Sequence, residues 1–338
     1  MSKQNTFKKI AVFRALQLGD MLCSIPAIKA LKEKFPEAEI DLIGLPWAKD
    51  FVNRFPHYFN GFIPFPGFPG LPEQGYDPFL VADFILEMNK KKYDLIIQMQ
   101  GNGSVINPLI ALLGAKEIVG YFESDKYMPS SGFIPYPEHC HEIERHLTLI
   151  KSLGIDCCDT SLEFPVLESE LNQFQNLKKE FNLQERKYVC IHPGARDIKR
   201  RWKSEYFSKI AEEIAGYGFK LVFTGTESER KIIENVILKL RSEYVNLCGK
   251  TNIGTISLLI KEAFMLFSND TGVSHIATAV KTPSVVLFLT SDPMRWAPMN
   301  KQLHRIIMPK ETNNYNIVSL MTKQLINELK KSETINKS

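Results

Sequence analysis

Two polar turns in the second half of the chain have the residue types of an anion-binding site. One reads Asn-Asp-Thr-Gly at 269–272, between an apolar run and a helical pattern, and the other reads His-Pro-Gly-Ala at 192–195. At a strand-to-helix turn, the free N–H groups of the first helical turn and the helix dipole attract negative charge. A basic cluster at 199–201 follows the second turn. Together these features predict a phosphate-bearing ligand, and a nucleotide is the ligand that we expect.

Asp20, near the start of the chain, is a candidate catalytic carboxylate. Asp20 follows Gly19 shortly after the apolar run 10–13. An aspartate at such a position can cap a helix. At the carboxyl end of a strand it can also act as a general base toward a bound hydroxyl. One role does not exclude the other.

The elements that must position these residues alternate along the whole chain. Apolar runs typical of strands occur at 10–13, 39–43, 93–97, 117–119, 188–191, 220–223, 263–267 and 284–288, and helical patterns occur at 22–35, 207–215 and 229–240. This alternation predicts parallel sheets with helices on both faces. We therefore predict an α/β protein with two doubly wound domains.

The domain boundary is predicted where the pattern changes. Pro165 interrupts it, and the next segment is polar and helix-prone, which gives domains at 1–165 and 186–316. The segment 317–338 is predicted to hold a helix that packs back across the cleft, with a frayed tail from Lys331. Because ligands of paired α/β domains bind at the carboxyl ends of strands, we expect the site in the cleft.

Composition narrows the class of protein. The 338 residues suit two domains, and 44% hydrophobic and 24% charged residues are typical of a globular protein. A net charge of +4 fits an anionic ligand or membrane surface, and no basic block predicts nucleic-acid binding. The six cysteines form no Cys-x-x-Cys pair, which predicts free thiols in a reducing cytoplasm. The first residues lack the apolar core of a signal peptide, and no run is long enough to span a bilayer.

The segment 55–78 has an unusual composition. It contains five phenylalanines among many glycines and prolines. An irregular loop anchored by aromatic side chains is the simpler interpretation. A loop that faces an acceptor or a membrane is the functional alternative, because exposed aromatics often mark an interaction surface.

Taken in order, these segments resemble glycosyltransferase family 9, the ADP-heptose:lipopolysaccharide heptosyltransferases. The family's Arg-x-x-x-x-Gly-Asp turn corresponds to 14–20, and its link toward the second domain corresponds to 141–146. The turn at 192–195, the basic residues before Trp202 and the Asn-Asp-Thr-Gly-x-x-His motif at 269–275 complete the set. Each piece alone is weak, but the ordered set covers nearly the whole chain.

The resemblance implies a GT-B fold, with two Rossmann-like domains facing across a cleft. It implies an inverting, metal-independent sugar transfer without a cofactor. The expected donor is a nucleotide-diphosphate sugar, most simply ADP-heptose, and the expected acceptor is a glycolipid or lipopolysaccharide core. A cytoplasmic location follows, with peripheral contact with the inner membrane left open. Another donor or acceptor, or a catalytically inactive nucleotide-binding protein, is the alternative.

The resemblance also assigns residues. Asp20 becomes the general base, and Gly19 lies beside the acceptor. The donor-binding set is Gly194, Ala195, Glu229, Asp270, Thr271, Gly272 and His275. Glu227 competes with Glu229 for the place near the ribose, and His275 is equally well explained as a buried structural histidine.

The diphosphate contact is ambiguous within the basic cluster. The family has a lysine two residues before the tryptophan, and here Arg200 holds that position with Lys199 one residue earlier. We predict Lys199 as the principal phosphate contact and Arg200 as its support, because a compact ammonium can approach two phosphate oxygens. The cluster of His139, Cys140, His141 and His146 lacks the spacing of a structural zinc site.

Overall fold

The computed structural model describes residues 6–123 and 126–335. The chain divides into two compact units, Met1–Ser161 and Leu162–Ser338, and each is described by itself. In the part that the structure describes, no helix is long and apolar enough to cross a bilayer.

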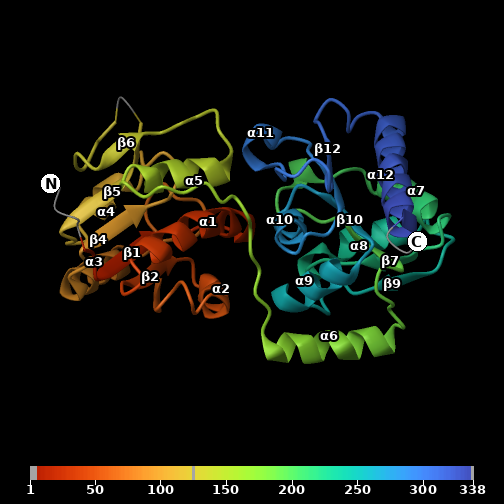
Figure 1. Cartoon of the computed structure of the whole chain (residues 1–338), viewed down its shortest axis with the longest axis horizontal. Coiled ribbons are helices and arrows are strands. Elements are labelled where there is room, and N and C mark those ends of the chain that lie inside the picture. Colours follow the sequence, from red (N-terminus) through yellow and green to blue (C-terminus); the bar gives the residue numbers. More distant parts are fainter. Residues whose placement is uncertain (1–5, 124–125, 336–338) are drawn as a thin grey trace. The chain divides into compact units, whose positions relative to one another are not determined.

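The first unit is a six-stranded parallel sheet with helices (Figure 1). Its strands are β1 (Lys9–Phe13), β2 (Glu39–Gly44), β3 (Gly61–Pro64), β4 (Leu95–Gln98), β5 (Glu117–Phe122) and β6 (Phe133–Pro135). Its helices are α1 (Leu18–Lys34), α2 (Ala48–Arg54), α3 (Pro78–Lys91), α4 (Asn107–Ala111) and α5 (Glu142–Lys151).

The second unit has the same architecture. Its strands are β7 (Tyr188–His192), β8 (Lys220–Phe223), β9 (Tyr244–Asn246), β10 (Met265–Asn269), β11 (Ser284–Leu287) and β12 (His304–Ile307). Its helices are α6 (Glu168–Glu180), α7 (Ser204–Ala215), α8 (Arg230–Ile237), α9 (Ile253–Glu262), α10 (Gly272–Ala279), α11 (Pro293–Trp296) and α12 (Tyr315–Ile335), with short 3-10 turns at Ile198–Arg200 and Glu227–Glu229.

Both sheets have the strand order of a doubly wound fold. The first runs β3-β2-β1-β4-β5-β6, and the second runs β12-β11-β10-β7-β8-β9. In each sheet the order reverses between two central strands, β1 and β4 in the first and β7 and β10 in the second. Ligands of open parallel sheets bind outside the carboxyl ends of the strands at this switch point. The segments that follow these four strands are therefore where a site is expected.

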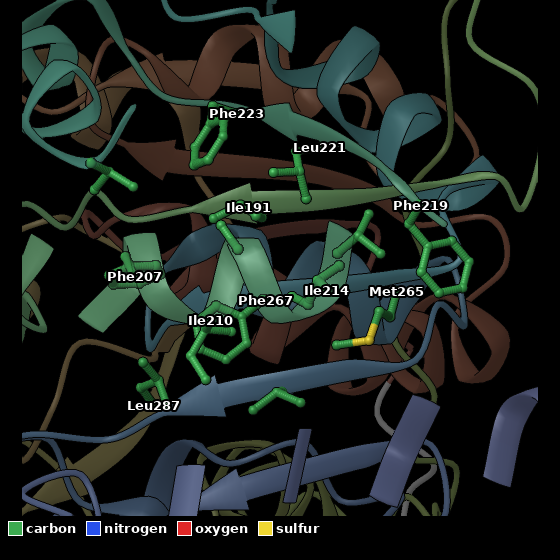
Figure 2. Close-up of a cluster of buried hydrophobic side chains, with 14 of the residues drawn as sticks. Ile191, Phe207, Ile210, Ile214, Phe219, Leu221, Phe223, Met265, Phe267 and Leu287 are labelled. Carbon is green, nitrogen blue, oxygen red and sulfur yellow. The ribbon is translucent and has the colours of Figure 1, made fainter. Parts of the chain in front are cut away.

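A packed core fixes the strand ends of the second unit. One face of α7 carries Phe207, Ile210 and Ile214 at helical spacing, and all three are fully buried. Figure 2 shows them against side chains of β7, β8, β10 and β11, among them Ile191 and Phe267. Because interiors are close-packed, the carboxyl ends of β7 and β10 have little freedom to shift.

The structure can be compared with several of the sequence predictions. The predicted C-terminal helix exists as α12, and it packs against α7 and β12 of the second unit. Residues 331–335, which were predicted to belong to a frayed tail, continue α12, and residues 336–338 lie outside the described residues. The segment 55–78 is not wholly irregular, because β3 lies within it, and Phe55, Phe59 and Phe65 are buried anchors. All six cysteines are free thiols.

Candidate active site

Asp20 lies at the switch point of the first sheet, in the segment that follows β1. Gln17 occupies the N-cap position of α1, and Asp20 is the third residue of the helix. The alternative role of Asp20 as N-cap is therefore not what the structure has. The Asp20 side chain is 23% exposed, so solvent reaches part of it.

Arg14 contacts Asp20 from the buried side. Its guanidinium is fully buried, and its Nε donates to the Asp20 carbonyl oxygen at 2.8 Å. Its Nη2 lies 3.0 Å from Glu142 Oε1 and 3.8 Å from Asp20 Oδ1. The sequence motif contained Arg14, but nothing local in the sequence could indicate its partner on α5.

Gly194 lies beside Glu229 at the switch point of the second sheet. A Cβ atom at Gly194 would lie 2.1 Å from Glu229 Oε1, so the close approach needs glycine. Glu229 is buried, and its Oε2 accepts from the Thr226 N–H and hydroxyl at 2.8 and 2.9 Å. Glu227 is exposed and pairs with Arg230 at 2.5 Å. The structure thus brings Glu229, and not Glu227, to the turn.

His192 ends β7 in the same place. Its Nδ1 lies 3.1 Å from the Thr224 hydroxyl, and its Nε2 lies 3.9 Å from Glu229 Oε2. Burial lowers the pKa of His192, which favours a neutral imidazole. The turn therefore presents polar groups without a fixed positive charge of its own.

The second turn is organised around Asp270, which is only 3% exposed. The Ser291 hydroxyl donates to Asp270 Oδ2 at 2.5 Å, and Arg200 Nη1 lies 3.6 Å from the same oxygen. These contacts hold the carboxylate, and the arginine offsets its charge. Asp270 is thus placed to order the turn.

The helix start beside Asp270 has the features of an anion site. α10 begins at Gly272, and Thr271 occupies its N-cap without a side-chain cap bond. The first-turn N–H groups are therefore not capped by Thr271, and the helix dipole favours negative charge there. His275 is buried on the same helix, with its ring 6.2 Å from that of Trp296. This packing leaves both interpretations of His275 open.

The three cations of the basic cluster have different surroundings. Arg201 Nε donates to the Ala195 carbonyl at 2.7 Å and so ties the cluster to the first turn. Arg200 reaches Asp270 of the second turn. Lys199 is exposed, and its backbone N–H donates to Asp197 Oδ1 at 2.9 Å. Arg201 and Arg200 therefore contact the first and the second turn, respectively, whereas the exposed Lys199 side chain makes no such contact within the described residues.

Asn269 connects the two turns, a role that the sequence analysis did not assign. It is fully buried at the end of β10. Its Nδ2 donates to the Pro193 carbonyl at 2.8 Å, and its Oδ1 accepts from the Trp202 N–H at 3.1 Å. Its position next to Asp270 in the motif could have indicated this role in the sequence. Nothing in the sequence indicated that Ser291 would contact Asp270.

The histidine and cysteine cluster at 139–146 lies next to α5 and takes part in local hydrogen bonds. Within the described residues, no three His, Cys, Asp or Glu side chains gather in a metal-binding arrangement. His141 caps α5 by accepting from the Ile143 N–H at 3.2 Å. The Cys140 carbonyl accepts from Arg145 at 3.4 Å.

The chain is similar in sequence to known glycosyltransferases over most of its length. Residues 81–324 match the model of glycosyltransferase family 9 (heptosyltransferase). Lipopolysaccharide heptosyltransferase 3 of Escherichia coli K12 is 25% identical over 295 residues, which cover 84% of this chain and 83% of that protein. Lipopolysaccharide heptosyltransferase 2 of Salmonella typhimurium is 25% identical over 305 residues, 86% of each chain.

Solved structures of such proteins share the fold. E. coli ADP-heptose lipopolysaccharide heptosyltransferase II has a TM-score of 0.76 at 19% identity, over 97% of this chain and 99% of that one. E. coli heptosyltransferase WaaC with ADP has a TM-score of 0.71 at 17% identity, over 95% and 99%. The predicted GT-B fold of two Rossmann-like domains is confirmed.

Since the family model covers well over half of it, the chain belongs to glycosyltransferase family 9. It is therefore a glycosyltransferase, and the resemblance seen in the sequence motifs is confirmed.

Proposed function

We propose that this protein is an inverting, metal-independent heptosyltransferase that transfers heptose from ADP-heptose to a lipopolysaccharide core or related surface glycan. The observation that carries the proposal is the chemistry at the two switch points. The first sheet presents a solvent-accessible carboxylate, Asp20, and the second presents two anion-type turns with a basic cluster. The relatives named lipopolysaccharide heptosyltransferases support this choice of acceptor.

In the proposed reaction, Asp20 takes the proton from an acceptor hydroxyl. The hydroxyl oxygen then attacks the anomeric carbon of the donor sugar from the face opposite the diphosphate. The new C–O bond forms as the bond to the diphosphate breaks, ADP leaves, and the anomeric configuration inverts. Negative charge grows on the diphosphate oxygens. Lys199, with Arg200 in support, and the N–H groups of Thr271 and Gly272 would stabilise it.

The direct test is transfer of heptose from ADP-heptose to a lipopolysaccharide core acceptor, followed by mass spectrometry and ADP release. Thermal stabilisation by ADP-heptose, compared with other nucleotide sugars, identifies the donor, because a ligand at 100 times its Kd stabilises the folded state by about 2.7 kcal/mol. Transfer from a different nucleotide sugar would change the donor. If the protein binds the donor but neither transfers the sugar nor slowly hydrolyses the donor, an inactive nucleotide-binding protein would be favoured.

Activity is expected to survive removal of divalent cations. The sequence has no Asp-x-Asp motif at a strand end, and basic side chains lie at the second switch point. The rate of ADP release should be the same with EDTA as with added Mg²⁺ or Mn²⁺. Full loss with EDTA and recovery with Mg²⁺ would mean that an ion offsets the diphosphate charge.

Glu229→Ala is expected to weaken donor binding, because we propose that this carboxylate accepts hydrogen bonds from the ribose hydroxyls. Loss of a charged hydrogen bond costs about 1.5–3 kcal/mol, which is roughly a 10- to 150-fold increase in the Kd of ADP-heptose. Glu227→Ala is the matched control, since Glu227 is exposed and paired with Arg230. Calorimetry on both variants decides the matter, and a larger effect at Glu227 would reverse the assignment.

A further inference from the structure

A buried row of alternating charges leads to Asp20 in the first unit. Arg145 contacts one carboxylate oxygen of Glu142, and Arg14 contacts the other at 3.0 Å. Arg14 in turn lies 3.8 Å from Asp20 Oδ1. The side chains of Arg14, Glu142 and Arg145 are at most 2% exposed, whereas that of Asp20 is 23% exposed. Asp20 is therefore the most exposed of these four side chains.

Backbone carbonyls fix both arginines in the row. Arg14 donates to the carbonyl oxygens of Met99 and Asp20, which belong to the segments after β4 and β1. Arg145 donates from Nε and Nη2 to the Pro137 carbonyl at 3.1 and 3.0 Å. A planar guanidinium held through several donors has one orientation. Neither arginine can therefore swing to a new partner without losing several bonds.

His146 adds no charge to the row near neutral pH. It is buried on α5, with its Nε2 3.3 Å from Glu142 Oε1. Burial, together with the charge of Arg14, lowers the pKa of His146 to about 4. Glu142 therefore faces two cations and one neutral imidazole, and its negative charge is shared between Arg14 and Arg145.

The distances indicate what Glu142 does for Asp20. Its carboxylate is closer to Arg14 than that of Asp20 is, 3.0 Å against 3.8 Å. In a poorly solvated interior, the nearer charge dominates. Without the Glu142 carboxylate, the Arg14 guanidinium, which its contacts with the Met99 and Asp20 carbonyls hold in place, would attract the Asp20 carboxylate more strongly. A closer ion pair would occupy the oxygen that must accept a proton.

We propose that Arg14 and Glu142 are positioning residues for the transfer reaction. Glu142, on α5, holds Arg14 at a distance from which it fixes the first turn of α1 and the Asp20 carboxylate without closing onto it. α1 and α5 pack against each other, which keeps this distance (Figure 1). The inference rests on the proposed role of Asp20 as base.

The test is a double-mutant cycle on the full chain. Wild type, Asp20→Asn, Glu142→Gln and the double variant are assayed for ADP release with ADP-heptose and a lipopolysaccharide core acceptor. Glu142→Gln alone should lower kcat roughly 10- to 100-fold, the effect of a small misplacement of a reacting group. The KM for ADP-heptose should not change, because the proposed donor-binding residues belong to the second unit. In the Asp20→Asn background, Glu142→Gln should change kcat less than about twofold, because coupled effects are not additive.

Tyr93→Phe is the matched control. The Tyr93 hydroxyl donates to a carboxylate oxygen of Asp41; Tyr93 lies just before β4, and Asp41 is the third residue of β2. The substitution removes a partly buried hydrogen bond to a carboxylate and should leave kcat unchanged. If circular dichroism shows that Glu142→Gln does not fold, Arg14→Lys replaces it in the double-mutant cycle. This substitution keeps the positive charge but loses the planar guanidinium with its several donors.

The outcomes separate the two proposals. If Asp20→Asn lowers kcat strongly while Glu142→Gln has normal kcat, or lowers it by the same factor in both backgrounds, the positioning role is wrong and Asp20 remains the base. If Asp20→Asn is fully active, the assignment of the base is wrong and the positioning role falls with it.

Discussion

Asp20→Asn is expected to lower turnover by roughly 10²–10⁴-fold, the usual span for loss of a general base. Asparagine has nearly the same shape but cannot accept the proton of the attacking hydroxyl. The Asp20 main chain would keep its bond from Arg14, because that bond uses the carbonyl oxygen. The turn should therefore survive the change. Single-turnover ADP release, under conditions where chemistry limits the rate, is the measurement.

Two controls make this result specific. The affinity for ADP-heptose should be unchanged, because the predicted donor residues belong to the second unit. Asp159→Asn removes a partly exposed carboxylate of the same unit, which pairs with Lys29 at 2.9 Å, and it should keep full activity. Near-normal turnover of Asp20→Asn would remove Asp20 from the role of base.

Lys199→Ala is expected to cost more catalytic efficiency than Arg200→Ala, by about 1–3 kcal/mol as for a lost charge-assisted hydrogen bond. The Arg200 guanidinium is engaged with Asp270 at 3.6 Å. The Lys199 side chain is exposed, and its ammonium forms no ion pair with the residues that the structure describes. This arrangement favours Lys199 as the contact that approaches the diphosphate, with Arg200 as the group that holds the turn.

The comparison needs kcat/KM for both variants on the same donor. Lys203→Ala is the control, because Lys203 is an exposed cation just after Trp202 whose ammonium lies over the Tyr206 ring at 5.3 Å. A larger loss for Arg200→Ala would exchange the two roles. Equal, small losses in all three variants would make the cluster a solvated surface.

The sequence predicted the central strands of both sheets and missed the edges. The eight predicted runs correspond to β1, β2, β4, β5, β7, β8, β10 and β11. The four strands without a predicted run, β3, β6, β9 and β12, are the four edge strands. A central strand of a parallel sheet is covered on both faces and reads as a continuous apolar run. An edge strand is paired on one side only, and β9, for example, is mostly exposed or half-buried.

Local sequence also identified the turns, because a turn after a strand depends on the glycine and polar residues that directly follow the apolar run. Gly194 and the segment from Asp270 to Gly272 were found in this way, and the structure has them after β7 and β10. The family resemblance then supplied the roles that the turns alone could not. In this sense the order of motifs along the chain determined the fold and the class of enzyme.

Only the tertiary structure decided which side chains meet. The sequence analysis assigned Glu229 and left Glu227 as its competitor. The packing of the turn at Thr226 buries Glu229 against Gly194 and leaves Glu227 exposed. Arg14 and Glu142 are 128 residues apart, and they meet because α5 packs against α1. Periodicity and turn chemistry report on neighbours in the chain. A contact between distant residues depends on how whole elements pack, and no local pattern records that packing.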